Sequence, residues 1–114
     1  MAATPAGDLG EPFRRISVDE AKTIMERGGV QIVDVRQPQE YATGHVPGAV
    51  LIPLDALLKR SGELSREDDL IFVCAVGERS AVTSEIAATV GRTKIMNMEG
   101  GMAAWVKRGY PIEK

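Results

Sequence analysis

The chain has 114 residues, and its 14 Lys and Arg against 16 Asp and Glu give a net charge of −2 with the single histidine neutral. Hydrophobic residues make up 44% and charged residues 26%, the composition of one soluble globular domain. The only cysteine, Cys74, excludes an internal disulfide, and the sequence has no Cys and His cluster of the kind that holds structural zinc. The slightly acidic balance argues against a nucleic acid partner. The longest apolar run, Leu70 to Val76, is far shorter than the roughly 20 residues that span a bilayer, which argues against a membrane partner.

The first residues are small or polar and are interrupted by Gly and Pro. We therefore expect a flexible tail over residues 1–12 and one domain over residues 13–114. The N-terminus lacks the basic start and apolar block of a signal peptide. We expect a cytoplasmic location, where a lone thiol stays reduced.

The pattern along the domain alternates between helices and strands. In the first half we expect a helix with a capping box at Ser17–Glu20 that ends at Gly28, a buried strand over Val30–Val35, a short helix from Pro38 to near Gly44, a short strand over Ala49–Ile52, and a short amphipathic helix at Leu54–Leu58.

The second half continues the same alternation. We expect a strand over Leu70–Val73, a loop over Cys74–Arg79, a helix that carries Val82, Ile86 and Val90 and closes at Gly91, a central strand over Lys94–Met98, and a last helix that follows Gly100-Gly101 and stops at Gly109. Strands separated by helices of about ten residues predict the α/β class, with an open, mainly parallel sheet and helices on both faces.

The segment Cys74–Ser80 is the candidate site, because it runs from the end of a buried strand into the start of a helix. Sites in open α/β sheets lie at the carboxyl ends of strands. Free N–H groups at a helix start, with Gly77 allowing a tight bend, can form an anion cradle. A cysteine there is expected to be a thiolate nucleophile, and Arg79 and Ser80 add donors. The alternative is a small buried hydrophobic residue, which needs none of this context.

The chain resembles the single-domain rhodanese family of sulfurtransferases. The residues that carry the resemblance run in the family's order along almost the whole chain: Asp34-Val35-Arg36, Glu40-Tyr41, Gly44-His45-Val46-Pro47-Gly48-Ala49, Ile52-Pro53, the Cys74–Ser80 loop, and Glu99-Gly100-Gly101-Met102-Ala103-Ala104-Trp105.

The resemblance implies a five-stranded parallel α/β fold and a persulfide on Cys74. It also implies that the backbone amides of Ala75, Val76, Gly77, Glu78, Arg79 and Ser80 hold the transferred group. The donor would be thiosulfate or a persulfide, and the acceptor cyanide in an assay or a thiol or protein in the cell. No metal or organic cofactor is expected.

Four residues separate Cys74 from Arg79. Related phosphatases and arsenate reductases use five, which makes a wider cradle for a tetrahedral oxyanion. The spacing thus favours sulfur transfer. Glu78 lies inside the loop, and a carboxylate there is expected to repel anionic donors unless it pairs with Arg79 or points into solvent. We therefore expect thiosulfate to be a usable but not an ideal donor.

Arg36 follows a strand end on the side where Cys74 is also expected. It is predicted either to line the pocket rim and bind substrate or to pair with Glu40 and fix the loop. His45 is expected to have a structural hydrogen-bonding role, and Tyr41 and Trp105 to be packing residues.

Four functions remain open from the sequence. The leading one is a thiosulfate-type sulfurtransferase. The second is a sulfur-relay or regulatory module that receives sulfur from a partner protein. A phosphatase or arsenate reductase of related fold is disfavoured by the loop spacing. A non-catalytic binding domain is disfavoured by the presence of Cys74.

Overall fold

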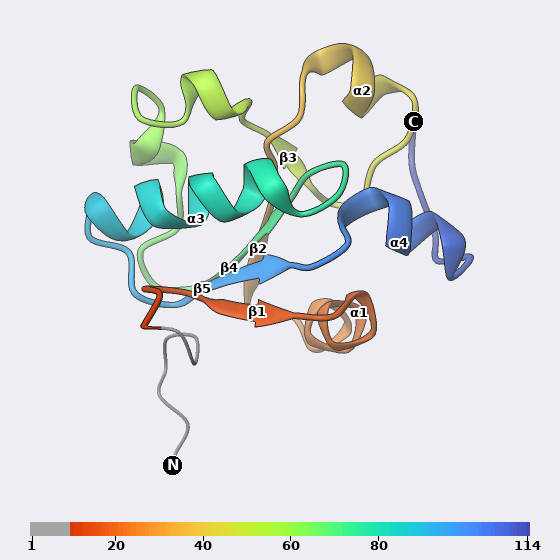
Figure 1. The fold of residues 1–114 in the computed structure, drawn as a ribbon, viewed down its shortest axis with the longest axis horizontal. Helices are drawn as coiled ribbons and strands as arrows, with labels where there is room; N and C mark the ends of the chain where they lie inside the picture. The colour runs from red at the N-terminus through yellow and green to blue at the C-terminus, as the bar shows by residue number, and fades with distance from the viewer. Residues whose placement is uncertain (1–9) are drawn as a thin grey trace.

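The computed structural model describes residues 10–114 (Figure 1). Its elements in chain order are β1 (Arg14–Ile16), α1 (Val18–Arg27), β2 (Val30–Asp34), α2 (Pro38–Ala42), β3 (Val50–Leu51), two 3-10 turns (Leu54–Ala56 and Ser61–Glu63), β4 (Asp69–Val73), α3 (Glu78–Thr89), β5 (Ile95–Met98) and α4 (Gly101–Lys107). The α/β class and the alternation of elements are confirmed.

The five strands form one sheet in the order β1-β5-β4-β2-β3, and all four neighbouring pairs are parallel. The long central pair runs from Val30 beside Asp69 to Asp34 beside Val73. Because parallel strands end at the same edge of a sheet, the segments after Asp34 and after Val73 leave it side by side. This edge is where the site was expected.

The sheet separates two apolar cores. On one face α1 and α4 pack against the strands, and the buried residues there include Ala21, Ile32, Ile71, Met98 and Trp105. On the other face α3 and the 3-10 turns cover the strands, and the buried residues include Val33, Leu57, Phe72, Ala87 and Cys74. Figure 1 shows the same arrangement, with α3 on one side of the sheet and α1 and α4 on the other. Helices on both faces are thus confirmed.

The capping box of α1 forms as predicted. Ser17 Oγ accepts from the Glu20 amide at 3.0 Å, and Glu20 Oε1 accepts from the Ser17 amide at 2.9 Å. These bonds satisfy two N–H groups at the helix start. Gly28 then ends the helix with φ +82°, a conformation that favours glycine.

Two features differ from the sequence-based expectation. Strand β1 was not predicted, because an edge strand of three residues with two exposed arginines gives almost no apolar signal. The helix expected at Leu54–Leu58 is a single 3-10 turn over Leu54–Ala56, too short to develop an amphipathic face. The predicted tail lies outside the described residues as far as residue 9. Glu11 forms a surface ion pair with Arg15, and the flexibility of the tail stays a prediction.

Candidate functional site

Cys74 follows the last residue of β4 and is 1% exposed. Its Sγ accepts hydrogen bonds from the Gly77 amide at 3.1 Å and from the Ser80 amide at 3.3 Å, and Ser80 Oγ lies 3.3 Å away. The predicted loop therefore curls around the sulfur. These donors come from both sides of the start of α3, where amide groups have no partner within the helix.

The surroundings of Cys74 act on its pKa in opposite directions. Burial raises the pKa of the thiol, while hydrogen bonds from the Ser80 hydroxyl and from the Ser80, Gly77 and Val76 amides lower it. The hydrogen bonds prevail, so the pKa of Cys74 lies below its ordinary value of 9.0. A lowered pKa means a larger fraction of thiolate, the nucleophilic form.

Gly77 makes the loop possible. Its φ is +99°, and it stands directly before the first residue of α3. A Cβ at this position would lie 3.1 Å from the Gly100 amide nitrogen, because the loop rests on the turn between β5 and α4. The predicted tight bend at Gly77 is confirmed, and the close approach gives a second reason for glycine.

The start of α4 supports the other end of the loop. The Met102 amide donates to the Cys74 carbonyl at 2.8 Å, and the Ala103 amide donates to the Ala75 carbonyl at 3.0 Å. A Cβ at Gly101 would lie only 2.4 Å from the Cys74 carbonyl oxygen. From the sequence, Gly100-Gly101 indicated only a tight turn. The pair of glycines was the available signal that another backbone comes this close.

Arg79, predicted as a substrate donor, is engaged elsewhere. Its Nη1 and Nη2 donate to Glu40 Oε1 and Oε2 at 2.8 and 2.9 Å. Glu40 Oε1 also accepts from the Gln37 amide at 2.9 Å. The hydrogen bond from Arg79 is the main cause that lowers the pKa of Glu40 from 4.5 to about 2. The guanidinium thus joins α3 to α2.

The structure corrects the prediction for Arg36. The expected Arg36–Glu40 ion pair is wrong, because Arg79 occupies the Glu40 carboxylate. Arg36 is 5% exposed, and it donates to the Asp34 carboxylate at 2.8–3.2 Å and to the Gly44 carbonyl at 2.8 Å. These contacts tie the end of β2 to the segment after α2. A role for Arg36 in binding substrate stays a prediction, with no contact in its favour.

Three further residues of the predicted loop are more exposed to solvent than Cys74. Ala75 is half-buried, Val76 is 55% exposed, and Glu78 is exposed as the first residue of α3. Since Arg79 bonds to Glu40, the expected alternative in which Glu78 points into solvent holds. The binding of substrate by the amides from Ala75 to Ser80 stays a prediction.

His45 has the structural role that the sequence predicted. Its Nδ1 lies 2.9 Å from the Tyr41 carbonyl oxygen, and its ring stacks on that of Tyr41 with centroids 3.6 Å apart. The His45 backbone also pairs with that of Glu113 near the C-terminus. These contacts hold the segment after α2 in place.

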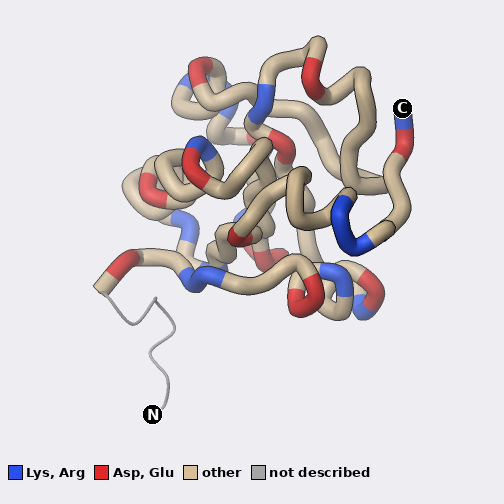
Figure 2. Tube along the Cα trace, turned by 45° about the vertical axis from the view of Figure 1, so that its right-hand side comes forward, with Lys and Arg blue, Asp and Glu red and all other residues tan. Residues whose placement is uncertain are grey.

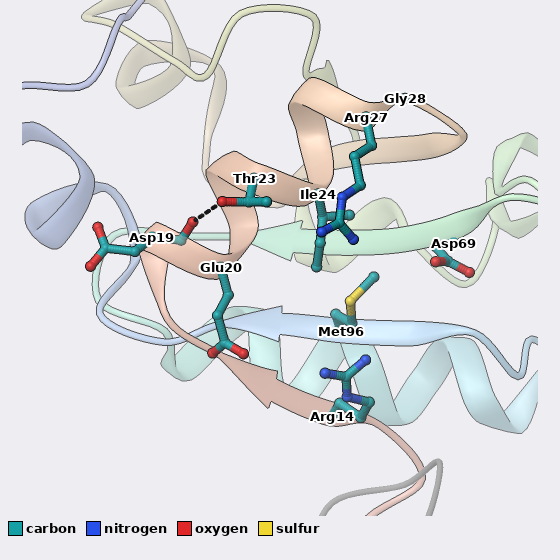
Figure 3. A pocket seen from close by; sticks show the side chains of 9 residues that line it. All are labelled: Arg14, Asp19, Glu20, Thr23, Ile24, Arg27, Gly28, Asp69 and Met96. Carbon is teal, nitrogen blue, oxygen red and sulfur yellow. Dashed lines mark hydrogen bonds between the residues drawn. The ribbon is translucent and has the colours of Figure 1, made fainter.

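A separate cavity of about 580 Å³ opens between α1 and the β1 side of the sheet (Figure 3). It lies near the amino ends of the strands, whereas Cys74 follows a carboxyl end. Its lining mixes both charges and includes Arg14, Arg27, Glu20 and Asp69, and it contains no predicted site residue. Figure 2 shows the same mixture of charges along the rest of the described chain. Anion affinity at Cys74 therefore has to come from local groups.

Among residues 10–114, no group of three His, Cys, Asp or Glu side chains is placed to hold a metal ion. None of the helices in this part of the chain is long and apolar enough to cross a membrane.

One protein-family model matches most of the chain. The rhodanese-like domain family matches residues 17–108. An HTH-type transcriptional regulator of Mycobacterium tuberculosis is 34% identical over 116 residues, which cover 100% of this chain and 51% of the regulator. The chain thus spans about half the length of that relative. A sulfurtransferase of Allochromatium vinosum is 32% identical over 83 residues, which cover 73% of this chain and 78% of the relative.

Solved structures give the same result. A rhodanese-related protein of Thermoplasma volcanium is 29% identical with a TM-score of 0.82, and the match covers 89% of this chain and 98% of that one. A human single-domain sulfurtransferase is 26% identical with a TM-score of 0.73, and the match covers 87% and 98%. With the match over residues 17–108, the five-stranded parallel sheet and the Cys74 loop between β4 and α3, the chain belongs to the rhodanese-like domain family.

Proposed function

We propose that this domain transfers sulfane sulfur through a persulfide on Cys74. The observation that carries the proposal is the position of the Cys74 Sγ, which accepts two backbone N–H groups at the start of α3. These bonds favour the thiolate, and we expect the remaining amides of the Cys74–Ser80 loop to stabilise the terminal persulfide anion, whose charge lies one S–S bond farther out than Sγ. Relatives and structural neighbours named as sulfurtransferases support the same chemistry.

The first half-reaction loads the cysteine. The Cys74 thiolate attacks the outer sulfur of thiosulfate and forms a new S–S bond. The bond from that sulfur to the sulfonate sulfur breaks, and sulfite leaves with the electron pair. One negative charge remains on the enzyme, now on the outer persulfide sulfur. A low-molecular-weight persulfide reacts in the same way and releases a thiolate.

The second half-reaction removes the outer sulfur from the Cys74 persulfide. An acceptor nucleophile, which is cyanide in an assay and a thiol or a protein in the cell, attacks the outer sulfur. The S–S bond breaks, and the electron pair returns to the Cys74 thiolate. Since the chain has no other cysteine, the persulfide cannot resolve as an internal disulfide. The sulfur must leave to an external acceptor, which predicts ping-pong kinetics.

Two features disfavour the phosphatase alternative. The loop arginine that would clamp a phosphate as a bidentate partner is already bonded to both oxygens of Glu40. Cys74 is 1% exposed, so the single outer sulfur of a small donor can reach its Sγ more easily than the bulkier phosphoryl group of a phosphorylated side chain. The four-residue spacing between Cys74 and Arg79 points the same way.

A mass measurement tests the proposal. The reduced protein is incubated with thiosulfate, and the intact mass is expected to increase by one sulfur atom. Addition of cyanide is expected to remove that sulfur as thiocyanate. Cys74→Ser is the control and should show neither event. A folded, reduced sample that takes up no sulfur from thiosulfate or from a low-molecular-weight persulfide would defeat this function.

A second candidate is a sulfur-relay module that is loaded by a partner protein. It is favoured by the similarity to a protein of Bacillus subtilis named as a putative sulfur carrier and by the match to half of a transcriptional regulator, in which the matching region is part of a longer chain. In that case the mass increase appears only when the partner is present. Small donors would then leave Cys74 unchanged even though its thiolate is reactive toward alkylating agents.

A further inference from the structure

Asn97 is a buried polar residue directly beneath the Cys74 loop. It lies on β5, is fully buried, and pairs in register with Phe72 of β4, so its side chain lies on the face of the sheet that α3 covers. Its Nδ2 donates to the Gly77 carbonyl at 3.2 Å and to the Glu99 carboxylate. The side chain therefore connects the last central strand to the loop that surrounds the cysteine.

Asn97 is the one polar residue on the otherwise apolar strand β5. Its neighbours on β5 are Ile95, Met96 and Met98, all buried and apolar. Within the described residues the Asn97 Oδ1 has no hydrogen-bond partner, so burial of this amide carries an uncompensated cost. An aliphatic side chain would fill the site without that cost. The contacts that an aliphatic side chain cannot make are those to the Gly77 carbonyl and to the Glu99 carboxylate, and only the first reaches the cysteine loop.

Gly77 is the loop residue that most needs to be held. Its amide donates to Cys74 Sγ at 3.1 Å, and it stands immediately before α3 with φ +99°. Glycine has more backbone freedom than any other residue, so its own conformational preference does not fix this geometry. A hydrogen bond on its carbonyl restricts the residue and so restricts the direction of its N–H group.

Glu99 determines which way the Asn97 amide points. The two groups next to the Asn97 amide, the Gly77 carbonyl and the Glu99 carboxylate, can only accept hydrogen bonds. The amide nitrogen Nδ2 must therefore face them. Arg15 in turn donates to Glu99 Oε2 at 2.9 Å from strand β1. A chain of contacts thus runs from the edge strand β1 through Glu99 and Asn97 to the loop.

We propose that Asn97 is a positioning residue for Cys74: it holds Gly77 so that the Gly77 N–H points at Sγ, and Glu99 orients the Asn97 amide for this task. The effect of Asn97 on turnover rests on the proposed sulfur transfer. The effect of Asn97 on the reactivity of the Cys74 thiol does not, because that reactivity can be measured without any sulfur donor.

The test is the pH dependence of Cys74 alkylation by iodoacetamide. Loss of the aligned Gly77 donor in Asn97→Ser is expected to raise the midpoint by about one pH unit, which lowers the rate below the midpoint about tenfold. Glu99→Ala is expected to shift the midpoint in the same direction by less. Arg15→Ala, which removes the outer ion pair and leaves the Asn97 contacts, is the matched control and should change the rate less than about twofold.

Asn97→Ser and Glu99→Ala each have an outcome that decides against the proposal. An Asn97→Ser protein that is folded, as shown by its thermal transition, and keeps the wild-type midpoint overturns it. If Asn97→Ser does not fold, Glu99→Ala decides, because the Glu99 side chain is partly exposed and outside both apolar cores. An unchanged midpoint in that variant overturns the proposal as well. A wild-type chain that takes up no sulfur defeats the proposed function and leaves this result standing.

Discussion

The Arg79 guanidinium donates to both carboxylate oxygens of Glu40, and this pair joins the helix that follows the cysteine loop to α2. Both side chains are 34% exposed. The positive charge next to the loop is therefore largely neutralised by a partner within the same domain. What remains to stabilise an anion on Cys74 is the set of backbone amides and the Ser80 hydroxyl.

The first prediction concerns acid stability. The pKa of Glu40 falls from 4.5 to about 2 in the folded protein. A depressed carboxyl pKa stabilises the fold above the unfolded value, and this contribution is lost as the pH falls from 4.5 toward 2. Since the pair is one-third exposed, we expect Glu40→Gln to lose only about 1 kcal/mol near neutral pH and nothing below about pH 2.

Urea unfolding of both proteins at a series of pH values measures this difference. The two stability curves should converge as the pH falls through the window. Glu63→Gln, which breaks the more exposed pair with Arg60, is a suitable control for loss of a surface carboxylate. Parallel curves for Glu40→Gln and the wild type over the whole range would contradict the prediction.

The second prediction contrasts the two arginines near the site. Arg36 is buried against Asp34, which is fully buried as well, whereas Arg79 and its partner reach solvent. Removing one partner of a buried pair leaves an uncompensated charge. We therefore expect Arg36→Met to cost about 3–5 kcal/mol of stability, and Arg79→Met about 1 kcal/mol or less.

Chemical denaturation at neutral pH compares the two variants directly. The double variant Asp34→Asn/Arg36→Met is the control, because it removes both charges together and should recover part of the loss. Equal losses for Arg36→Met and Arg79→Met would show that burial does not distinguish these two pairs.

The sequence was sufficient to predict the elements that carry a local signal. The buried strand Val30–Asp34 and the helix that begins at Ser17 were predictable because β-branched runs and capping boxes are local signals. The position of Cys74 at a strand end followed from the same alternation. Strand β1 was not predictable, because its three residues depend on pairing with β5, far along the chain.

The partners of charged side chains were the part that the sequence could not supply. Arg36 and Glu40 are four residues apart and suggested a local pair, yet each has its partner elsewhere. The pairing depends on where β2 ends and where α3 begins in space. The role of Asn97 was missed for the same reason, since a lone Asn in an apolar strand indicates nothing until the loop above it is placed.

The third prediction concerns the donor. Glu78 is exposed at the start of α3 beside the loop, and Arg79 does not neutralise it. Because Glu78 points into solvent, only a weak, screened part of its charge reaches a donor at the loop, so Glu78→Gln should lower the thiosulfate KM by no more than about twofold, with little change in kcat. The effect should shrink at high ionic strength.

Steady-state thiocyanate formation at low and high salt measures this effect. Glu85→Gln makes the same charge change two turns farther along α3 and should leave the KM unchanged. An unchanged KM in Glu78→Gln would mean that this carboxylate does not act on the donor.

The fourth prediction tests the close contact between α4 and the loop. Gly101 and Gly109 both have positive φ, at +56° and +75°, so alanine is strained at either position. Only at Gly101 would the new Cβ meet a backbone atom, the Cys74 carbonyl oxygen at 2.4 Å, whereas nothing lies within 4 Å at Gly109. We expect Gly101→Ala to cost about 1–3 kcal/mol more stability than Gly109→Ala.

The same pair of variants separates an effect on the loop from general destabilisation. The displaced Cys74 carbonyl should weaken its bond from the Met102 amide and shift the loop, so alkylation of Cys74 at neutral pH should slow in Gly101→Ala. Gly109→Ala carries the backbone strain without the contact and should keep the wild-type alkylation rate. If both variants alkylate at that rate while Gly101→Ala is the less stable, the contact supports the fold but does not set the geometry of the cysteine.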